Sequence, residues 1–194
     1  MNRIIKKIII KNIKKKLHKF GNNSAIDAST VIVGGDFINI GDNFSAGRNL
    51  YLQVWNSYRG KPIDYVPELV IGDNVSMMDD CQLSCVQSIK IEDGVLFGNN
   101  VFITDNFHGE STPQEMLIPP LKRRLFSKGP VLIKKNVWLG RNVCVMPNVV
   151  IGEGAVIGAN SVVTHNIPDY SIAVGSPARI IKQYKSNNFH NKYK

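Results

Sequence analysis

The sequence predicts an all-β fold of the parallel β-helix class, and two observations lead to this prediction. Aliphatic residues return at every sixth position late in the chain, at Ile133, Leu139, Val145, Ile151, Ile157 and Val163. The residue three places after each of them is always Asn or Gly. An α-helix repeats at about 3.6 residues and a strand at about 2, so neither alone gives a period of six. A coil of short strands and tight corners does give it.

The corner positions of this repeat carry residues that accept a positive φ at little cost. We therefore expect left-handed backbone at Asn136, Asn142, Asn148, Gly154, Asn160 and Asn166. The same register appears upstream, with inward residues at Ile71, Met77, Leu83, Ile91, Phe97 and Ile103 and corners at Gly94, Asn100 and Asn106. The β-helix is thus predicted from about Asp27 to Thr164.

Two segments, residues 53–69 and 109–130, interrupt the repeat. Long interruptions of a regular scaffold are loops, and loops on rigid scaffolds often carry function. We predict three parts: a basic amphipathic N-terminal helix at 1–20, a β-helix domain at 21–175 with these two loops, and a short C-terminal helix with a polar tail at 176–194.

Composition indicates one globular domain, because 194 residues with 43% hydrophobic content suit a single core. The three cysteines, Cys81, Cys85 and Cys144, form no pairing framework, and we expect reduced thiols that pack in or beside the coil. No apolar stretch approaches the roughly 20 residues of a membrane span.

The positive charge is concentrated at the N-terminus, where residues 1–20 hold eight of the 24 Lys and Arg and none of the 15 Asp and Glu. The rest of the chain is nearly neutral, so the charge does not indicate nucleic-acid binding. Ile5, Ile9, Ile13 and Leu17 form one apolar helical stripe opposite lysines. Two interpretations stay open: a helix docked on the coil with a solvated basic face, or a peripheral anchor to anionic lipid. We expect a cytoplasmic protein, either free or held at the inner face of the membrane.

Several motifs make the chain resemble the hexapeptide-repeat acyltransferases, and among them the bacterial sugar and polysaccharide O-acetyltransferases. They are Ile103-Thr104-Asp105-Asn106-Phe107-His108-Gly109, Ser127-Lys128-Gly129-Pro130-Val131, Asn136-Val137-Trp138-Leu139-Gly140, Ile157-Gly158-Ala159-Asn160-Ser161, and Val174-Gly175-Ser176-Pro177-Ala178-Arg179. The resemblance implies a left-handed parallel β-helix, acetyl-CoA as the acyl donor, a sugar or glycan acceptor and a homotrimer. It implies no metal.

The catalytic candidate is His108. Attack of a hydroxyl on a thioester needs a base, and histidine suits this at neutral pH. Of the four histidines, only His108 sits at a corner that opens onto an inserted loop. With Ile103 and Phe107 inward, His108 should point outward; an ordinary exposed loop histidine is the alternative. Galactoside-type enzymes place their histidine nearer Asn106. Asp105 and Asn106 could orient the imidazole, contact the acceptor or simply form the turn.

The resemblance also implies that the donor lies in a groove between neighbouring subunits. The matching positions are Gly140, Arg141, Ala159, Thr164, His165, Arg179 and Lys182. Small residues would admit the pantetheine arm, and Arg179 and Lys182 would meet phosphates. A solvated terminal helix is the alternative for those two cations. Trp138 is expected outward, at a subunit contact.

The acceptor site is not carried over by the resemblance, because Met78 and Cys85 stand where galactoside-type enzymes place acceptor-binding Asn and Asp. The aromatic-rich loop 53–69, with Trp55, Tyr58, Arg59 and Tyr65, suits either a sugar platform or a subunit contact. A carbonic anhydrase on this fold is disfavoured, since it needs three metal-binding histidines. An antibiotic acetyltransferase and a non-catalytic trimeric scaffold remain as alternatives.

Overall fold

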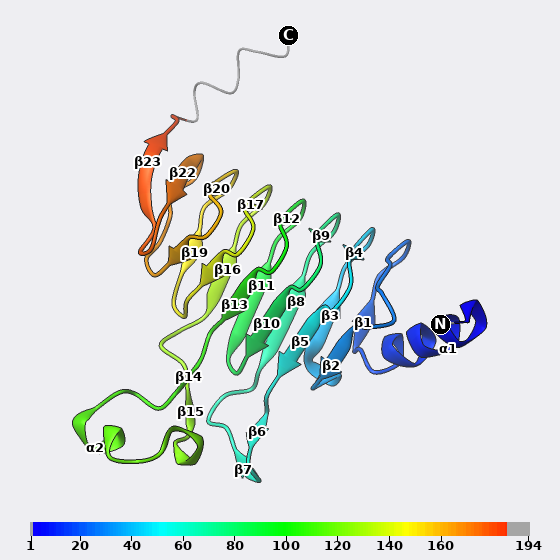
Figure 1. The fold of residues 1–194 in the computed structure, drawn as a ribbon, viewed down its shortest axis with the longest axis horizontal. Helices are drawn as coiled ribbons and strands as arrows, with labels where there is room; N and C mark the ends of the chain where they lie inside the picture. The colour runs from blue at the N-terminus through cyan, green and yellow to red at the C-terminus, as the bar shows by residue number, and fades with distance from the viewer. Residues whose placement is uncertain (1, 186–194) are drawn as a thin grey trace.

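The computed structural model describes residues 2–185, which wind into a three-sided β-helix (Figure 1). The first face holds β1 (Lys19–Phe20), β3 (Ile38–Ile40), β8 (Glu68–Ile71), β11 (Ser88–Ile91), β16 (Val131–Ile133) and β19 (Val150–Ile151). The second face holds β4 (Ser45–Ala46), β9 (Ser76–Met77), β12 (Leu96–Phe97), β17 (Trp138–Leu139), β20 (Val156–Ile157), β22 (Ser171–Val174) and β23 (Arg179–Gln183). The third face holds β2 (Val31–Val33), β5 (Tyr51–Val54), β10 (Gln82–Cys85), β13 (Phe102–Thr104), β18 (Cys144–Val145) and β21 (Val162–Val163).

Residues that occupy the same position in successive coils pair with one another along each face. Leu83 pairs with Ile103, Ile103 with Val145, and Val145 with Val163, all in parallel. These side chains are fully buried. Each contributes about 1.5–3 kcal/mol by leaving water, so the predicted inward positions do form the core.

The predicted corners adopt left-handed backbone at Asn136, Asn142, Asn148, Gly154 and Asn160, with φ between 58° and 63°. Two expected corners differ. Asn166 lacks a positive φ, and its side chain instead accepts a hydrogen bond from the backbone N–H of Val150 at 2.8 Å. Asn106 lacks one because the chain leaves the coil there.

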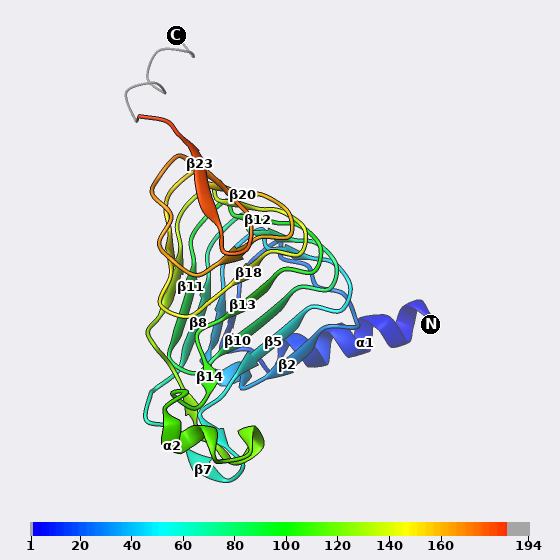
Figure 2. The same cartoon turned by 60° about the vertical axis from the view of Figure 1, so that its left-hand side comes forward.

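The N-terminal helix α1 (Arg3–Lys14) is shorter than the segment 1–20, and the β-helix begins earlier than Asp27, at β1. The second half of α1 docks on the coil, because Ile13 belongs to the buried core together with Leu17 just beyond the helix. The first half projects from the coil (Figure 2). None of the helices within residues 2–185 is long and apolar enough to cross a membrane.

The short C-terminal helix predicted after Pro177 is wrong, because residues Arg179–Gln183 form strand β23. The chain turns back through a cis Ser176–Pro177 peptide bond, and β23 pairs antiparallel with β22. A last parallel strand leaves an open hydrogen-bonding edge, which β23 covers. The β-branched Ile180 and Ile181 favour an extended strand in this position.

Both interruptions leave the β-helix from the end of the third face and project from the same corner (Figures 1 and 2). The first contains the hairpin β6 (Ser57–Tyr58) and β7 (Lys61–Pro62). The second contains β14 (Phe107–His108), α2 (Pro113–Met116), a 3₁₀ turn (Pro120–Lys122) and β15 (Leu125–Phe126); another 3₁₀ turn (Gly35–Phe37) precedes β3. Below, these two segments are called the first loop and the second loop.

Candidate active site

His108 lies on β14, a short strand that has left the coil and pairs antiparallel with β15, opposite Leu125. The next residue, Gly109, donates its N–H to the Arg124 carbonyl at 2.9 Å and has a φ of 85°, which only glycine adopts readily. His108 is exposed, as expected. The expected cause of this exposure, an inward Phe107 on the coil, is wrong. Phe107 is half-buried and lies outside the core, and the Lys128 ammonium is 5.4 Å from the centre of its ring.

One face of the His108 ring is held by an aromatic neighbour from the first loop. Tyr58 meets it edge-on, with ring centroids 5.5 Å apart and planes at 60°. Trp55 packs against Tyr58 in turn, at 6.4 Å and 88°. Within residues 2–185 the imidazole makes no hydrogen bond. It is therefore positioned by packing, and both nitrogens can reach a substrate.

Asp105 makes no hydrogen bond to His108 and instead holds the neighbouring corner of the coil. Its fully buried carboxylate accepts hydrogen bonds from the backbone N–H groups of Val86, Gln87 and Ser88, each at 2.8 Å. Burial, reinforced by this neighbouring carboxylate, raises the pKa of the Cys85 thiol well above its usual range. The arrangement clamps the tight corner between β10 and β11, which separates the two projecting loops.

Asn106 likewise bonds to the scaffold. Its side-chain amide donates to the Ser84 carbonyl at 2.9 Å and to the Ser84 hydroxyl at 3.2 Å, and its N–H donates to Thr104 Oγ1 at 3.1 Å. Of the roles considered for Asp105 and Asn106, this geometry favours the turn-forming one. Both residues set the point at which the chain departs toward His108.

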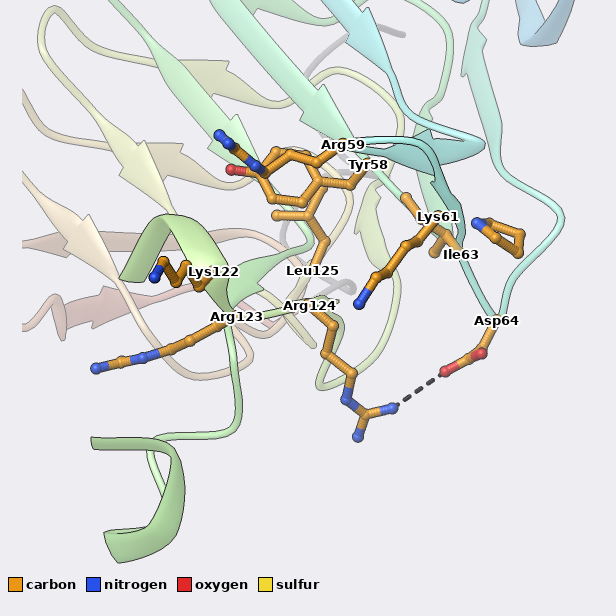
Figure 3. Close-up of a pocket in the computed structure, with 10 residues that line it drawn as sticks. Tyr58, Arg59, Lys61, Ile63, Asp64, Lys122, Arg123, Arg124 and Leu125 are labelled. Atoms are coloured by element: carbon orange, nitrogen blue, oxygen red, sulfur yellow. Dashed lines mark hydrogen bonds and ion pairs between the residues drawn. The ribbon is translucent and has the colours of Figure 1, made fainter. Parts of the chain in front are cut away.

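The two loops are joined to each other. The Tyr65 hydroxyl donates to the Ser127 carbonyl at 3.4 Å, and Arg124 pairs with Asp64 at 3.1 Å and also with Glu110. Between them lies a pocket of about 620 Å³ (Figure 3). Its lining residues are Tyr58, Arg59, Lys61, Pro62, Ile63, Asp64, Lys122, Arg123, Arg124 and Leu125.

Most of this pocket was missed by sequence reasoning. Of the four first-loop residues that it proposed, Trp55, Tyr58, Arg59 and Tyr65, only Tyr58 and Arg59 line the pocket. The second-loop side was signalled by the consecutive cations Lys122, Arg123 and Arg124. These cations and Lys61 line one pocket only because two separate insertions leave the same corner, which brings Arg124 to Asp64 across 60 positions of sequence. No pattern within one stretch of the sequence indicates that the two loops form one pocket.

The candidate donor residues fall on two different corners of the β-helix. Thr164 and His165 follow β21, two strands along the third face from β13, so they share the corner of His108. Strands lie about 4.8 Å apart, which puts Thr164 about 10 Å from Thr104 along that corner. Gly140, Arg141 and Ala159 instead follow β17 and β20, between the second and third faces.

These candidate donor residues differ in their exposure to solvent. Gly140 is buried, and a Cβ there would lie 2.7 Å from the Ala159 nitrogen, so coil stacking itself requires glycine. Arg141 and Ala159 are exposed. So are Thr164 and His165, which bond to each other through Oγ1 and Nδ1 at 2.8 Å.

Arg179 and Lys182 lie on β23, every residue of which is exposed. One guanidinium nitrogen of Arg179 bonds to the Ala178 carbonyl at 3.1 Å, and the Lys182 ammonium lies 4.6 Å from the Tyr184 ring. Because β23 is a strand, the alternative of a solvated terminal helix for these cations is wrong. Trp138 is half-exposed and outward, as expected.

Comparison with known proteins agrees with this fold. Residues 130–165 match the family described as bacterial transferase hexapeptide (six repeats). The putative lipopolysaccharide biosynthesis O-acetyl transferase WbbJ of Escherichia coli is 38% identical over 151 residues, which are 76% of this chain and 72% of that protein. The galactoside O-acetyltransferase of Lactococcus lactis is 33% identical over 147 residues, 74% of this chain and 64% of that protein.

Two solved structures extend the comparison. A variant of AntD, an N-acyltransferase from Bacillus cereus in complex with dTDP and coenzyme A, has a TM-score of 0.73 at 25% identity and covers 92% of this chain and 90% of its own. A maltose O-acetyltransferase from Clostridium difficile has a TM-score of 0.60 at 28% identity, over 77% of this chain and 72% of its own. The left-handed parallel β-helix predicted from the motifs is confirmed.

The coil, the exposed histidine beside two inserted loops and these similarities define an acyl-transfer enzyme built on a β-helix. The chain belongs to the hexapeptide-repeat acyltransferase family. Its relatives include O-acetyltransferases, and the predicted acetyltransferase activity and acetyl-CoA donor are confirmed. Within residues 2–185, no three His, Cys, Asp or Glu side chains gather to hold a metal ion.

Proposed function

We propose that this protein transfers the acetyl group of acetyl-CoA to a hydroxyl of a sugar in a surface polysaccharide or its precursor. The single observation that carries the proposal is His108. It is exposed, free of hydrogen bonds to the described residues, and in contact with Tyr58, which lines the pocket between the two loops. The polysaccharide acceptor is supported by the similarity to a putative lipopolysaccharide O-acetyl transferase.

In the proposed mechanism, neutral His108 takes the proton of the acceptor hydroxyl as its oxygen attacks the acetyl carbonyl. The new C–O bond forms, the C–S bond breaks, and coenzyme A leaves as the thiolate. No acyl-enzyme is needed, since the buried Cys85 and Cys81 thiols have raised pKa values and are poor nucleophiles. The Tyr58 ring keeps the imidazole in place during the transfer.

A coenzyme A release assay with a panel of acceptors tests this proposal. The panel contains neutral sugars, phosphorylated sugars, amino sugars and aminoglycoside antibiotics. We expect His108-dependent transfer to sugar hydroxyls. Preference for the antibiotics would favour the rival xenobiotic activity, and absence of transfer to every acceptor would favour a scaffold.

We further propose a homotrimer with active sites between subunits. The candidate donor and base residues sit on two corners of one chain, so a groove that touches both is most simply formed against a second chain. An outward row along the second face, Leu96, Trp138, Val156 and Ile172, offers an apolar surface for that contact. Leu96 is 37% and Trp138 52% exposed. Sedimentation of a stable monomer at micromolar concentration would contradict shared sites.

We also propose that the exposed side of the first half of α1 contacts anionic membrane. Ile4, Ile5 and Ile8 are 67%, 51% and 54% exposed and lie among lysines, which is the composition of an interfacial helix. The full chain should sediment with phosphatidylglycerol vesicles at low salt but not with phosphatidylcholine. Ile5→Asn/Ile8→Asn should lose this binding, whereas Val66→Asn, at a site 88% exposed, should keep it. Binding that survives the double change would leave α1 a docked helix only.

A further inference from the structure

The pocket between the two loops is strongly basic. Its lining includes five cations, Arg59, Lys61, Lys122, Arg123 and Arg124, and one carboxylate, Asp64. The cations come from both loops (Figure 3), Arg59 and Lys61 from the first and Lys122, Arg123 and Arg124 from the second. A concave surface lined by one sign of charge attracts ligands of the opposite sign.

Only part of this charge is neutralised within the protein. Arg124 is paired with Asp64 and Glu110, and the Arg123 Nε bonds to the Ile118 carbonyl at 2.8 Å. Arg59, Lys61 and Lys122 form no ion pair within residues 2–185. Three exposed like charges at one pocket repel one another, and a bound anion would relieve that repulsion.

The pocket is continuous with the candidate base. Tyr58 lines the pocket and also contacts the His108 ring, and Leu125 lines it and pairs with His108 across the β14–β15 hairpin. A ligand seated in the pocket would therefore touch residues that also contact His108. The volume of about 620 Å³ is in the ordinary range for a small-molecule site.

We propose that this pocket binds a phosphate or diphosphate group of the acceptor, so that the enzyme acetylates a phosphate-activated sugar in preference to the free neutral sugar. The inference rests on the function proposed above and specifies its substrate class. Lys61 and Lys122 act as point charges for the phosphate oxygens, and the free guanidinium nitrogens of Arg123 supply directed donors. The phosphate can belong to a nucleotide or to a lipid diphosphate.

Coenzyme A also carries phosphates, and the two cations that are candidates to meet them lie elsewhere. Arg179 and Lys182 sit on β23, at the end of the second face, whereas the pocket cations sit on loops that leave the third face. The placement assigns the loop pocket to the acceptor. The kinetic experiment below separates these two sources of phosphate.

The first experiment measures binding of inorganic pyrophosphate to the full chain by calorimetry, so it needs no knowledge of the acceptor. We expect saturable binding that weakens with salt. The double variant Lys61→Ala/Lys122→Ala should weaken it by about tenfold or more. The matched control Lys19→Ala/Lys90→Ala removes the same charge from exposed positions on the first face and should leave the affinity unchanged.

The second experiment compares glucose, glucose 1-phosphate and UDP-glucose as acceptors. The phosphorylated acceptors should have a KM lower by about tenfold or more. The pocket variant should remove that advantage without changing the KM for acetyl-CoA. Pyrophosphate should inhibit competitively against the phosphorylated acceptor.

Pyrophosphate affinity that is equal in the pocket variant and the control overturns the proposal, as does competition with acetyl-CoA alone. Transfer to neutral sugars that ignores pyrophosphate overturns the proposal but leaves the acetyltransferase function intact. Pocket-dependent pyrophosphate binding without transfer to any acceptor overturns the function, and the acceptor assignment with it.

Discussion

The ring of Tyr58 packs edge-on against the ring of His108, at a centroid distance of 5.5 Å, although 50 positions separate them in the sequence. The two residues come from different insertions, and the β-helix brings the insertions together by sending both out of the same corner. The orientation of the candidate base therefore depends on the first loop as well as on its own strand. This dependence leads to the first prediction.

Replacing Tyr58 by Ala should lower kcat by about two- to tenfold, because an aromatic pair contributes about 0.5–1.5 kcal/mol to the position of its partner. Tyr58→Phe keeps the ring and should retain most of the rate. The KM for acetyl-CoA should not move in either variant. An equal loss of rate in the Tyr58→Phe and Tyr58→Ala variants would instead indicate that the Tyr58 hydroxyl acts on the substrate.

Replacing Asp105 by Ala should destabilise the fold by about 3 kcal/mol or more, since three backbone N–H groups at one corner lose their acceptor, the Val86 N–H in a fully buried position. Thermal unfolding measures this. Asp73→Ala is the matched control, because that exposed corner carboxylate accepts one such bond, from Asp42 N–H, and should cost much less. Similar losses at both positions would contradict the clamp described for Asp105.

The thiols of Cys81 and Cys85 should resist alkylation in the native protein. Burial raises the pKa of Cys81 to about 11 and that of Cys85 further, so roughly one Cys81 thiol in a thousand is ionised at pH 8. Iodoacetamide labelling followed by mass spectrometry should modify half-buried Cys144 first and all three in denaturant. Fast native labelling of Cys85 would contradict its burial.

The docking of α1 should weaken in acid. The Lys6 ammonium lies 2.7 Å from the Asp27 carboxylate. Its hydrogen bond, and after it the bond from the Ser29 N–H, lower the pKa of Asp27 from 3.8 to about 2. A lowered pKa means that the contribution is fully present above about pH 4 and is lost as pH falls through about 2. The effect should be about 0.5–1 kcal/mol, because Lys6 is half-exposed.

Hydrogen exchange of α1 between pH 5 and pH 2.5 measures this effect, and the difference between the wild type and Asp27→Asn isolates the single group. The wild type should lose protection over that range, whereas the variant should have reduced protection at pH 5 and change less. Identical profiles for the two proteins would remove the Asp27–Lys6 pair from the account of helix docking.

The sequence predicted the β-helix because each coil repeats the same local requirements. An inward aliphatic residue and a left-handed corner are both visible as residue types, so Val145 and Asn142 could be placed from the pattern alone. The prediction of a helix after Pro177 was wrong, because the repeat has ended there and no longer indicates the conformation. Pairing with the open edge of β22 determines the conformation of Arg179–Gln183, and that is a tertiary effect.

The candidate site, like the fold, could be predicted from the sequence only in part. His108 could be proposed from its motif and its place beside an insertion. The interpretation of Phe107 as inward was wrong, because counting by six assumes that the chain stays on the coil, and it departs at Asn106. The basic pocket could not be predicted, since its two halves are distant in sequence and meet only through the stacking of β5, β10 and β13.

The most direct test of the central claim is the turnover of His108→Ala with acetyl-CoA and the acceptor found by the screen. If His108 is the base, turnover should fall by a factor of about 10²–10⁴ while the affinity for coenzyme A stays within about twofold of the wild type. Turnover that survives within a few-fold would contradict the assignment, and loss of coenzyme A binding would make His108 a donor contact instead.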